Sequence, residues 1–185
     1  MDIEGEGWEM LIKRQREQRR ESDGKRRTVG TYQVFHNGRK QTGADMSGTV
    51  AESRGPGANK PAENGKRIEE GRYPLFTQAG TKYVSIGYKE STSSTAKPKP
   101  GFELKSTGQR SEILIHPGQG FLASVGCINP CTSLPSASTL ITYETSRRRV
   151  ISLIEDMKAF IEGFPNSNGK KIPGAFVVID GEPEM

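Results

Sequence analysis

Residues 29–53, VGTYQVFHNGRKQTGADMSGTVAES, carry the clearest indication of fold in the chain. β-Branched and aromatic side chains dominate residues 31–35, which is typical of a strand. Asn37 and Gly38 follow directly, and this dipeptide is the strongest short-range signal for a hairpin turn. Residues 48–53 predict the next strand. The segment therefore indicates an antiparallel β structure.

Outward from this segment, more strands are predicted at residues 71–76, 83–88, 112–116 and 175–179. The stretches at 54–65 and 89–100 are rich in Gly, Pro and Ser, so we expect surface loops there. One helix is predicted, because apolar residues recur with a helical period at Val150, Leu153, Ile154, Met157 and Ile161. Thr145 or Ser146 would cap its start and Gly163 would end it. The prediction is a mainly β (α+β) fold, sandwich-like or barrel-like, with one packed helix and long loops.

Composition narrows the class of protein. The 185 residues fit one domain with a modest core, and 22 Gly with 11 Pro argue against a helical bundle. Two cysteines cannot form a disulfide framework or a four-cysteine zinc site. No apolar run approaches the roughly 18 residues of a membrane span. The acidic first residues do not resemble a signal peptide, so we expect synthesis in the cytoplasm.

Positive charge is concentrated near the start of the chain, where residues 8–27 read WEMLIKRQREQRRESDGKRR. Residues 8–21 are good helix formers, and Trp8, Leu11 and Ile12 would share one helical face. We therefore expect residues 1–28 to form a basic arm, helical or flexible, ahead of a single domain at residues 29–185. A basic run without interleaved aromatic residues is a weak signal for nucleic acid, so a solvated arm is favoured.

Residues 113–130, ILIHPGQGFLASVGCINP, form the segment most typical of an active site. A strand ends in His116, and Cys127 follows after a Gly-rich loop. An imidazole can take the proton of a thiol and leave a nucleophilic thiolate. Backbone N–H groups near Gly118 and Gly126 would approach a substrate closely enough to hold an oxyanion.

The same residues allow other interpretations. A buried cysteine is most often an inert small apolar residue, and His116 could simply bond a carbonyl group. A disulfide between Cys127 and Cys131 would close a strained small ring, which makes a free thiol the better prediction. A metal site is not expected, because His36 falls in a predicted turn and no carboxylate lies nearby in sequence. No cofactor is predicted.

The order of strand, His116, Gly-rich loop and Ser124-Val125-Gly126-Cys127 resembles the catalytic segment of the L,D-transpeptidase family, and particularly its small bacterial and phage relatives. Those enzymes cut and rejoin peptidoglycan stem peptides through a cysteine acyl-enzyme. The resemblance covers residues 29–163, and residues 66–74, KRIEEGRYP, resemble an upstream strand of these relatives.

Carried over residue by residue, the resemblance implies that Cys127 is the nucleophile, His116 its base and Ser124 a catalytic partner. Substrate-binding roles are expected for Asn129, Arg72 and Tyr73, and Arg110 and Tyr88 are further candidates for the cleft. The chain departs from the family at Val125, where a second His is usual, and at Asn129, where an Arg is usual. Its loop between His116 and Cys127 is also shorter.

The resemblance implies a cysteine peptidase or transpeptidase that acts on peptidoglycan peptides. Because that substrate lies outside the cytoplasm, delivery by a secretion machine or a phage is expected, with a secretion or immunity protein as partner. The alternative is a structural or binding module that keeps the fold without the chemistry. A membrane span and nucleic-acid binding are not expected.

Overall fold

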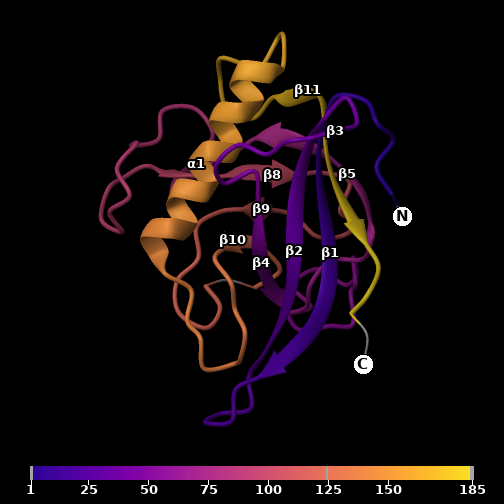
Figure 1. Ribbon diagram of the computed structural model, residues 1–185, viewed down its shortest axis with the longest axis vertical. Helices are drawn as coiled ribbons and strands as arrows, with labels where there is room; N and C mark the ends of the chain where they lie inside the picture. The colour runs from indigo at the N-terminus through magenta and orange to yellow at the C-terminus, as the bar shows by residue number, and fades with distance from the viewer. Residues whose placement is uncertain (1, 124, 184–185) are drawn as a thin grey trace.

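The computed structural model describes residues 2–123 and 125–183. The protein is mainly β, with a nearly closed, barrel-like mixed sheet and a single helix, as the sequence predicts (Figure 1). The strands of this sheet are β1 (Trp8–Arg19), β2 (Arg26–His36), β3 (Arg39–Lys40), β4 (Ser47–Ser53), β5 (Gly71–Thr77), β8 (Phe102–Leu104), β9 (Ile113–Ile115), β10 (Asn129–Cys131) and β11 (Lys171–Asp180). A separate two-stranded sheet pairs β6 (Tyr83–Val84) with β7 (Lys99–Pro100).

The sheet almost closes on itself. Its order is β10-β4-β2-β1-β11-β5-β8-β9, with β3 paired to β2 outside this path. A parallel bridge joins Ile115 at the end of β9 to Ile128, which directly precedes β10. The two edges of the sheet therefore meet at the segment that carries His116 and Cys127, because these residues directly follow Ile115 and precede Ile128.

The expected basic arm at residues 1–28, helical or flexible, is wrong: residues 8–19 form β1, which lies between β2 and β11, and β2 already begins at Arg26. β1 runs antiparallel to β2 and parallel to β11. Trp8, Met10 and Ile12 all belong to the main hydrophobic core and are fully buried. This alternation has the period of a strand, and pairing on both sides outweighs the helical preference of the individual residues.

The predicted hairpin is confirmed, since β2 and β3 flank a turn in which Asn37 and Gly38 both have positive φ. The strands predicted at 48–53, 71–76, 112–116 and 175–179 correspond to β4, β5, β9 and β11. The strand predicted at 83–88 is reduced to the two residues of β6. Neither β7 nor β8 is predicted from the sequence, because each is very short.

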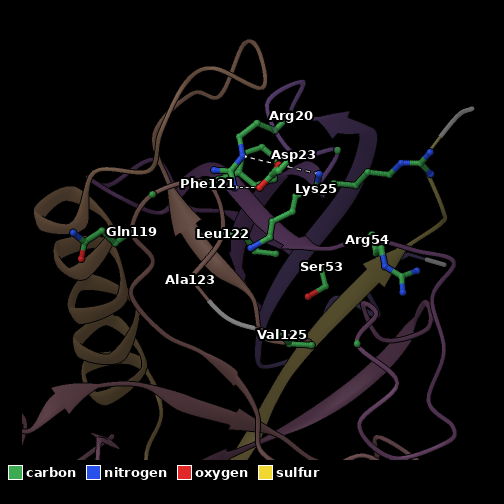
Figure 2. Close-up of a pocket in the computed structure, with 14 residues that line it drawn as sticks. Arg20, Asp23, Lys25, Ser53, Arg54, Gln119, Phe121, Leu122, Ala123 and Val125 are labelled. Atoms are coloured by element: carbon green, nitrogen blue, oxygen red, sulfur yellow. Dashed lines mark hydrogen bonds and ion pairs between the residues drawn. The ribbon is translucent and has the colours of Figure 1, made fainter.

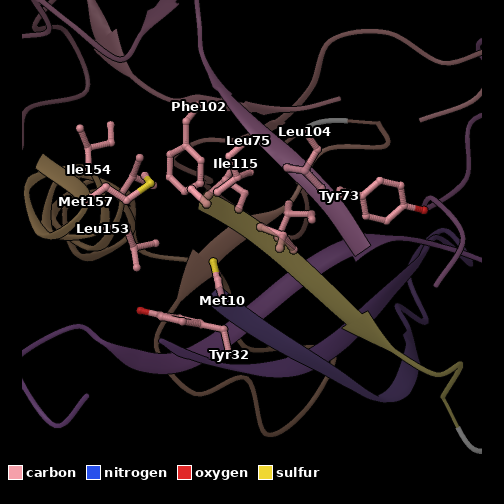
Figure 3. Close-up of a cluster of buried hydrophobic side chains, with 14 of the residues drawn as sticks. Met10, Tyr32, Tyr73, Leu75, Phe102, Leu104, Ile115, Leu153, Ile154 and Met157 are labelled. Carbon is pink, nitrogen blue, oxygen red and sulfur yellow. The ribbon is translucent and has the colours of Figure 1, made fainter. Parts of the chain in front are cut away.

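The predicted helix is α1 (Tyr143–Phe160), which begins earlier than expected because Thr142, not Thr145 or Ser146, occupies the N-cap position. Val150, Leu153, Ile154 and Met157 are buried in the main core. Figure 3 shows the last three facing Phe102, Leu75 and Ile115 of the barrel. The helix thus buries its apolar face against the barrel interior. This contact explains why apolar residues recur along α1 with a helical period.

Two fully buried arginines, Arg27 and Arg147, hold the long loops in place through backbone carbonyl groups, and neither has a carboxylate partner among the described residues. Arg27 of β2 donates to the carbonyl oxygens of Phe121, Ser136 and Thr139. Arg147 of α1 donates to the carbonyl oxygens of Lys89, Ser93 and Ala96. These bonds satisfy loop carbonyls that strands and helices do not pair. Within the described ranges, no helix is both long and apolar enough to cross a bilayer.

Candidate active site

The closing bridge of the barrel brings His116 and Cys127 to one cavity. His116 N–H donates to the Ile128 carbonyl at 3.2 Å, and Ile128 N–H donates to the Leu114 carbonyl at 2.8 Å. Ile115 and Ile128 point into the core, where both are fully buried. Since side chains alternate along a strand, the neighbours His116 and Cys127 lie on the opposite side. Both line a cavity of about 320 Å³.

The remaining walls of this cavity, which we call the thiol cavity, come from distant parts of the chain. They are formed by residues 78 and 80–83, around the start of β6, and by Glu112, Leu114 and Ala123. Lys82 and Glu112 are exposed and bring one charge of each sign to its rim. The thiol cavity therefore has polar as well as apolar walls.

His116 is held in one tautomer. Its Nδ1 lies 2.8 Å from the carbonyl oxygen of Pro117. A carbonyl oxygen only accepts hydrogen bonds, so we assign the ring proton to Nδ1, which makes Nε2 the nitrogen that accepts a proton. The ring of Tyr83 packs on His116 with centroids 4.4 Å apart. A base oriented by a third group is the arrangement that nucleophilic catalysis requires.

Burial keeps the His116 ring neutral. The side chain is only 3% exposed, and desolvation lowers its pKa from 6.5 to about 4, with a smaller contribution from the positive charges of Lys82 and Lys99. The Pro117 carbonyl acts in the opposite direction by stabilising the protonated ring. At neutral pH the imidazole is therefore available to accept a proton.

The Cys127 sulfur contacts the backbone just before and within β9. It accepts a hydrogen bond from Leu114 N–H at 3.3 Å and donates one to the Glu112 carbonyl at 3.4 Å. The first contact would persist in the thiolate, and the second is available only to the thiol. Glu112 has a φ of +54°, a left-handed conformation that is unfavourable for a residue with a side chain.

Arg110 supplies positive charge beside Cys127. Burial lowers the pKa of its guanidinium, and the electrostatic interaction with Cys127 acts in the opposite direction. A Cβ built on Gly126 would lie 2.2 Å from Arg110 Nη2, and Gly126 has a φ of +86°. Glycine is therefore required here on both steric and conformational grounds. Its small size lets the arginine approach the thiol.

The two glycine N–H groups expected to hold an oxyanion have other partners. Gly126 N–H donates to Ser53 Oγ at 2.8 Å, and Gly118 N–H donates to Ser146 Oγ at 2.8 Å. The structure thus corrects the expected oxyanion role of both amides. Local sequence could not reveal this, because the acceptors belong to β4 and α1.

The three expected substrate-binding residues do not line the thiol cavity. Asn129 is fully buried, and its Nδ2 donates to the His116 carbonyl at 3.0 Å. Tyr73 belongs to the main core and its hydroxyl donates to the Glu69 carbonyl at 2.6 Å. Arg72 pairs with Glu9 and lies over the Phe176 ring. Asn129 positions His116, and the other two have structural partners.

The other residues singled out in the sequence have varied positions. Ser124 lies outside the described residues. Cys131 is free and buried, so no disulfide joins it to Cys127, and burial raises its pKa to about 12. Val125 is 65% exposed. Tyr88 donates to the Glu155 carboxylate instead of lining the thiol cavity.

Among the described residues, no group of three or more His, Cys, Asp or Glu side chains is placed to hold a metal ion. His36 lies elsewhere, with its Nε2 2.6 Å from Asp156 Oδ2 and its ring stacked on Phe160.

Sequence reasoning missed Tyr83, Lys82 and the Pro117 carbonyl as parts of the site. Tyr83 and Lys82 lie more than thirty positions before His116, and no spacing rule connects a two-residue strand to it. The Pro117 contact depends on backbone geometry alone. Glu112 did offer a signal, because it is a charged residue directly before an apolar strand.

Comparisons with protein-family models, curated proteins and solved structures found no match. The side chains of the thiol cavity therefore have to carry the functional assignment.

Proposed function

We propose that the protein is a cysteine-dependent acyl-transfer enzyme in which Cys127 is the nucleophile and His116 the general base. The supporting observation is that both side chains line one cavity at the closing bridge, with His116 oriented by the Pro117 carbonyl. This arrangement gives a nucleophile, a base and a third group that fixes the tautomer of the base.

The reaction begins when the Cys127 sulfur attacks a peptide or amide carbonyl while its proton passes to His116 Nε2. The carbon–nitrogen bond then breaks, and the protonated imidazole returns the proton to the leaving amine. A thioester remains on Cys127. Water or a second amine then attacks the thioester, loses a proton through His116 and restores the thiol.

Positive charge around the site favours the anionic stages of this reaction. Arg110 interacts electrostatically with Cys127, while Lys82 lines the cavity and Lys99 contributes to the field at His116. Such fixed charges stabilise a thiolate and a tetrahedral oxyanion in a site partly shielded from water. Arg110 N–H groups also donate to the carbonyls of Ala58 and Lys66, which hold the guanidinium in place.

The proposed substrate is a peptidoglycan stem peptide, which follows from the resemblance of residues 113–130 to L,D-transpeptidases. Water as the acceptor would give a carboxypeptidase or endopeptidase, and an amine would give a transpeptidase. We propose delivery to the cell wall by a secretion machine or a phage. Because Asn129 is buried, substrate carboxylates must be bound by residues other than the one that aligns with the family arginine.

The test is mass spectrometry after incubation of the protein with muropeptides and with a carbapenem as an acylating probe. Acylation is expected on Cys127 and not on Cys131, which serves as an internal control because it is fully buried and has a raised pKa. His116→Gln should slow acylation by roughly 10²–10⁴-fold, the usual contribution of a general base. An unmodified Cys127 together with unchanged muropeptides would overturn the proposal.

A second candidate function is a binding module without catalysis. The thiol contact with the Glu112 carbonyl and the engagement of both glycine amides favour it. Alkylation by iodoacetamide below pH 7 separates the two functions. A module predicts a Cys127 rate no faster than that of a free thiol and unchanged in His116→Gln, whereas an enzyme predicts an accelerated, His116-dependent rate.

A further inference from the structure

The basic residues near the start of the chain have divided roles in the folded protein. Arg14 is buried against Glu52, at 2.7 Å, and Arg27 is buried against loop carbonyls. These two charges therefore stabilise the fold. Arg20, Lys25 and Arg26 instead gather at the tip of the β1–β2 hairpin, where Arg20 N–H donates to the Lys25 carbonyl at 2.7 Å.

This hairpin tip forms one wall of a second cavity of about 830 Å³, which we call the basic cavity (Figure 2). Arg54 adds a fourth cation to the lining, and Asp23 is its single carboxylate within the described chain. The formal charge of the lining is therefore +3, from four cations and one anion. Its volume lies in the range of pockets that hold a small molecule or a short peptide, roughly 300–1,000 Å³.

The positive charge of the basic cavity is poorly compensated. Asp23 pairs with Arg20 at 2.6 Å, and the Arg26 guanidinium reaches Glu17 only at 4.0 Å. The side chains of Lys25 and Arg54 are exposed, and neither forms an ion pair within the described residues. An anionic ligand would complete these interactions, since a hydrogen bond to a charged group is stronger than one between neutral groups.

The positive charges around Arg27 also favour an anionic ligand near the hairpin. Burial lowers the pKa of Arg27, the interaction with Cys131 acts in the opposite direction, and the positive charges of Arg20 and Arg16 lower it further. The hairpin therefore carries repulsion between like charges that a bound anion would relieve.

The basic cavity adjoins the thiol cavity. Ala123 lines both of them. Ser53, a further wall residue, accepts the hydrogen bond from Gly126, the residue directly before Cys127. The two cavities therefore share a wall at Ala123. Val125, 65% exposed, adds apolar surface to the basic cavity.

The aromatic residue of the basic cavity is unsuited to base stacking. Phe121 is only 5% exposed, and its ring lies under the guanidinium groups of Arg20 and Arg27, at 4.6 and 4.5 Å from the centroid. Single-stranded nucleic acids are bound through accessible aromatic faces along a basic track. The cations here surround a hollow beside the thiol, which favours a short anionic segment attached to an acyl group.

We infer that the basic cavity is the substrate-recognition site and binds the carboxylates of an acidic peptide whose carbonyl is placed at Cys127. This inference rests on the proposed acyl-transfer function and adds the chemical class of the substrate. Lys25 and Arg54 pair with the carboxylates, and the apolar wall contacts the intervening peptide.

The test measures binding separately from chemistry, by using the Cys127→Ala protein. Fluorescence anisotropy follows a labelled Ala-Glu-Ala-Glu-Ala peptide, its Gln-substituted neutral analogue and a single-stranded oligonucleotide of equal charge. Binding of the acidic peptide is expected to weaken about a hundredfold in Lys25→Glu/Arg54→Glu, which corresponds to about tenfold for each lost charged contact. Arg39→Glu/Lys40→Glu is the matched control, because both residues are exposed on β3, neither lines the basic cavity, and the net charge changes by the same amount.

The inference is supported if the acidic peptide binds, its neutral analogue binds much more weakly, and only the cavity variant loses affinity. Equal binding of the neutral analogue, equal losses in both charge variants, or tighter binding of the oligonucleotide would each overturn it. Circular dichroism of all three proteins establishes that the variants are folded. Loss of Cys127 acylation with intact peptide binding would refute the proposed chemistry alone, so the two failures are distinguishable.

Discussion

At the scale of single residues, His116 shows how burial sets a chemical state. The ring is removed from water at the closing bridge, and the Pro117 carbonyl accepts the proton of Nδ1. Desolvation lowers the pKa of His116 to about 4 because the charged ring loses its hydration. Burial of His116, which keeps the ring neutral, also makes the stability of the protein depend on pH.

Lowering the pH from 7 to 4.5 is expected to destabilise the wild type by about 2 kcal/mol more than His116→Gln. The unfolded ring, with a pKa of 6.5, gains a proton over this interval, whereas the folded ring titrates near 4. This contribution to stability is complete above pH 6.5 and is lost as the pH falls towards 4. Urea denaturation of both proteins across this range measures the difference, and parallel pH profiles would contradict the prediction.

At the scale of elements, one hydroxyl group connects the helix to the loop between His116 and Cys127. Ser146 in the first turn of α1 is fully buried. Its Oγ donates to the Pro130 carbonyl and accepts the Gly118 N–H. The segments on either side of the loop between His116 and Cys127 are therefore held by a residue that the sequence suggested only as a helix cap.

Ser146→Ala is expected to lower the free energy of unfolding by about 1–3 kcal/mol, because a buried N–H and a buried carbonyl lose their partner. Thr145→Ala is the control: its hydroxyl is in the same turn but exposed, so a change within about 0.5 kcal/mol is expected. Chemical denaturation gives both values. Equal effects of the two substitutions would show that Ser146 does not act as this link.

At the scale of the whole molecule, the barrel interior has an apolar region and a charged one. β1 contributes Trp8, Met10 and Ile12 to the core, and the next inward position is Arg14. Arg14 pairs with Glu52 and donates to the Ile68 carbonyl, both within hydrogen-bond distance. Nearby, Arg67 bonds Glu17. These charges are tolerated in the interior because each has well-placed partners.

Arg14→Met is expected to destabilise the fold by about 3–5 kcal/mol, because Glu52 would remain buried without its partner. The double variant Arg14→Met/Glu52→Leu should lose much less, since no uncompensated charge is left. A double-mutant cycle measured by denaturation tests this coupling. A double variant as unstable as the sum of the single variants would contradict it.

The helix predicted at residues 8–21 is the clearest failure. The apolar residues of this segment fit the spacing of a helix and also that of a strand. Trp8, Leu11 and Ile12 have helical spacing, whereas Trp8, Met10 and Ile12 have strand spacing. Two flanking strands decide between them, and one of these, β11, lies at the other end of the sequence. The basic residues also make the strand hard to predict. Arg14 and Arg27 are buried in the structure, but from the sequence alone an arginine is expected to be exposed to solvent.

The sequence by itself determined the mainly β class, the Asn37-Gly38 turn and the presence of one helix around Val150–Met157, because each depends on local backbone preference or on the period of apolar residues. The helix ends at Phe160, before the predicted end at Gly163. The sequence also singled out His116 and Cys127 as a pair to consider. Only the tertiary structure decided that these two share a cavity, that the glycine amides bond hydroxyl groups, and that a basic cavity shares Ala123 with the thiol cavity. Those contacts join residues far apart in the chain, and closure of the barrel sets their distances.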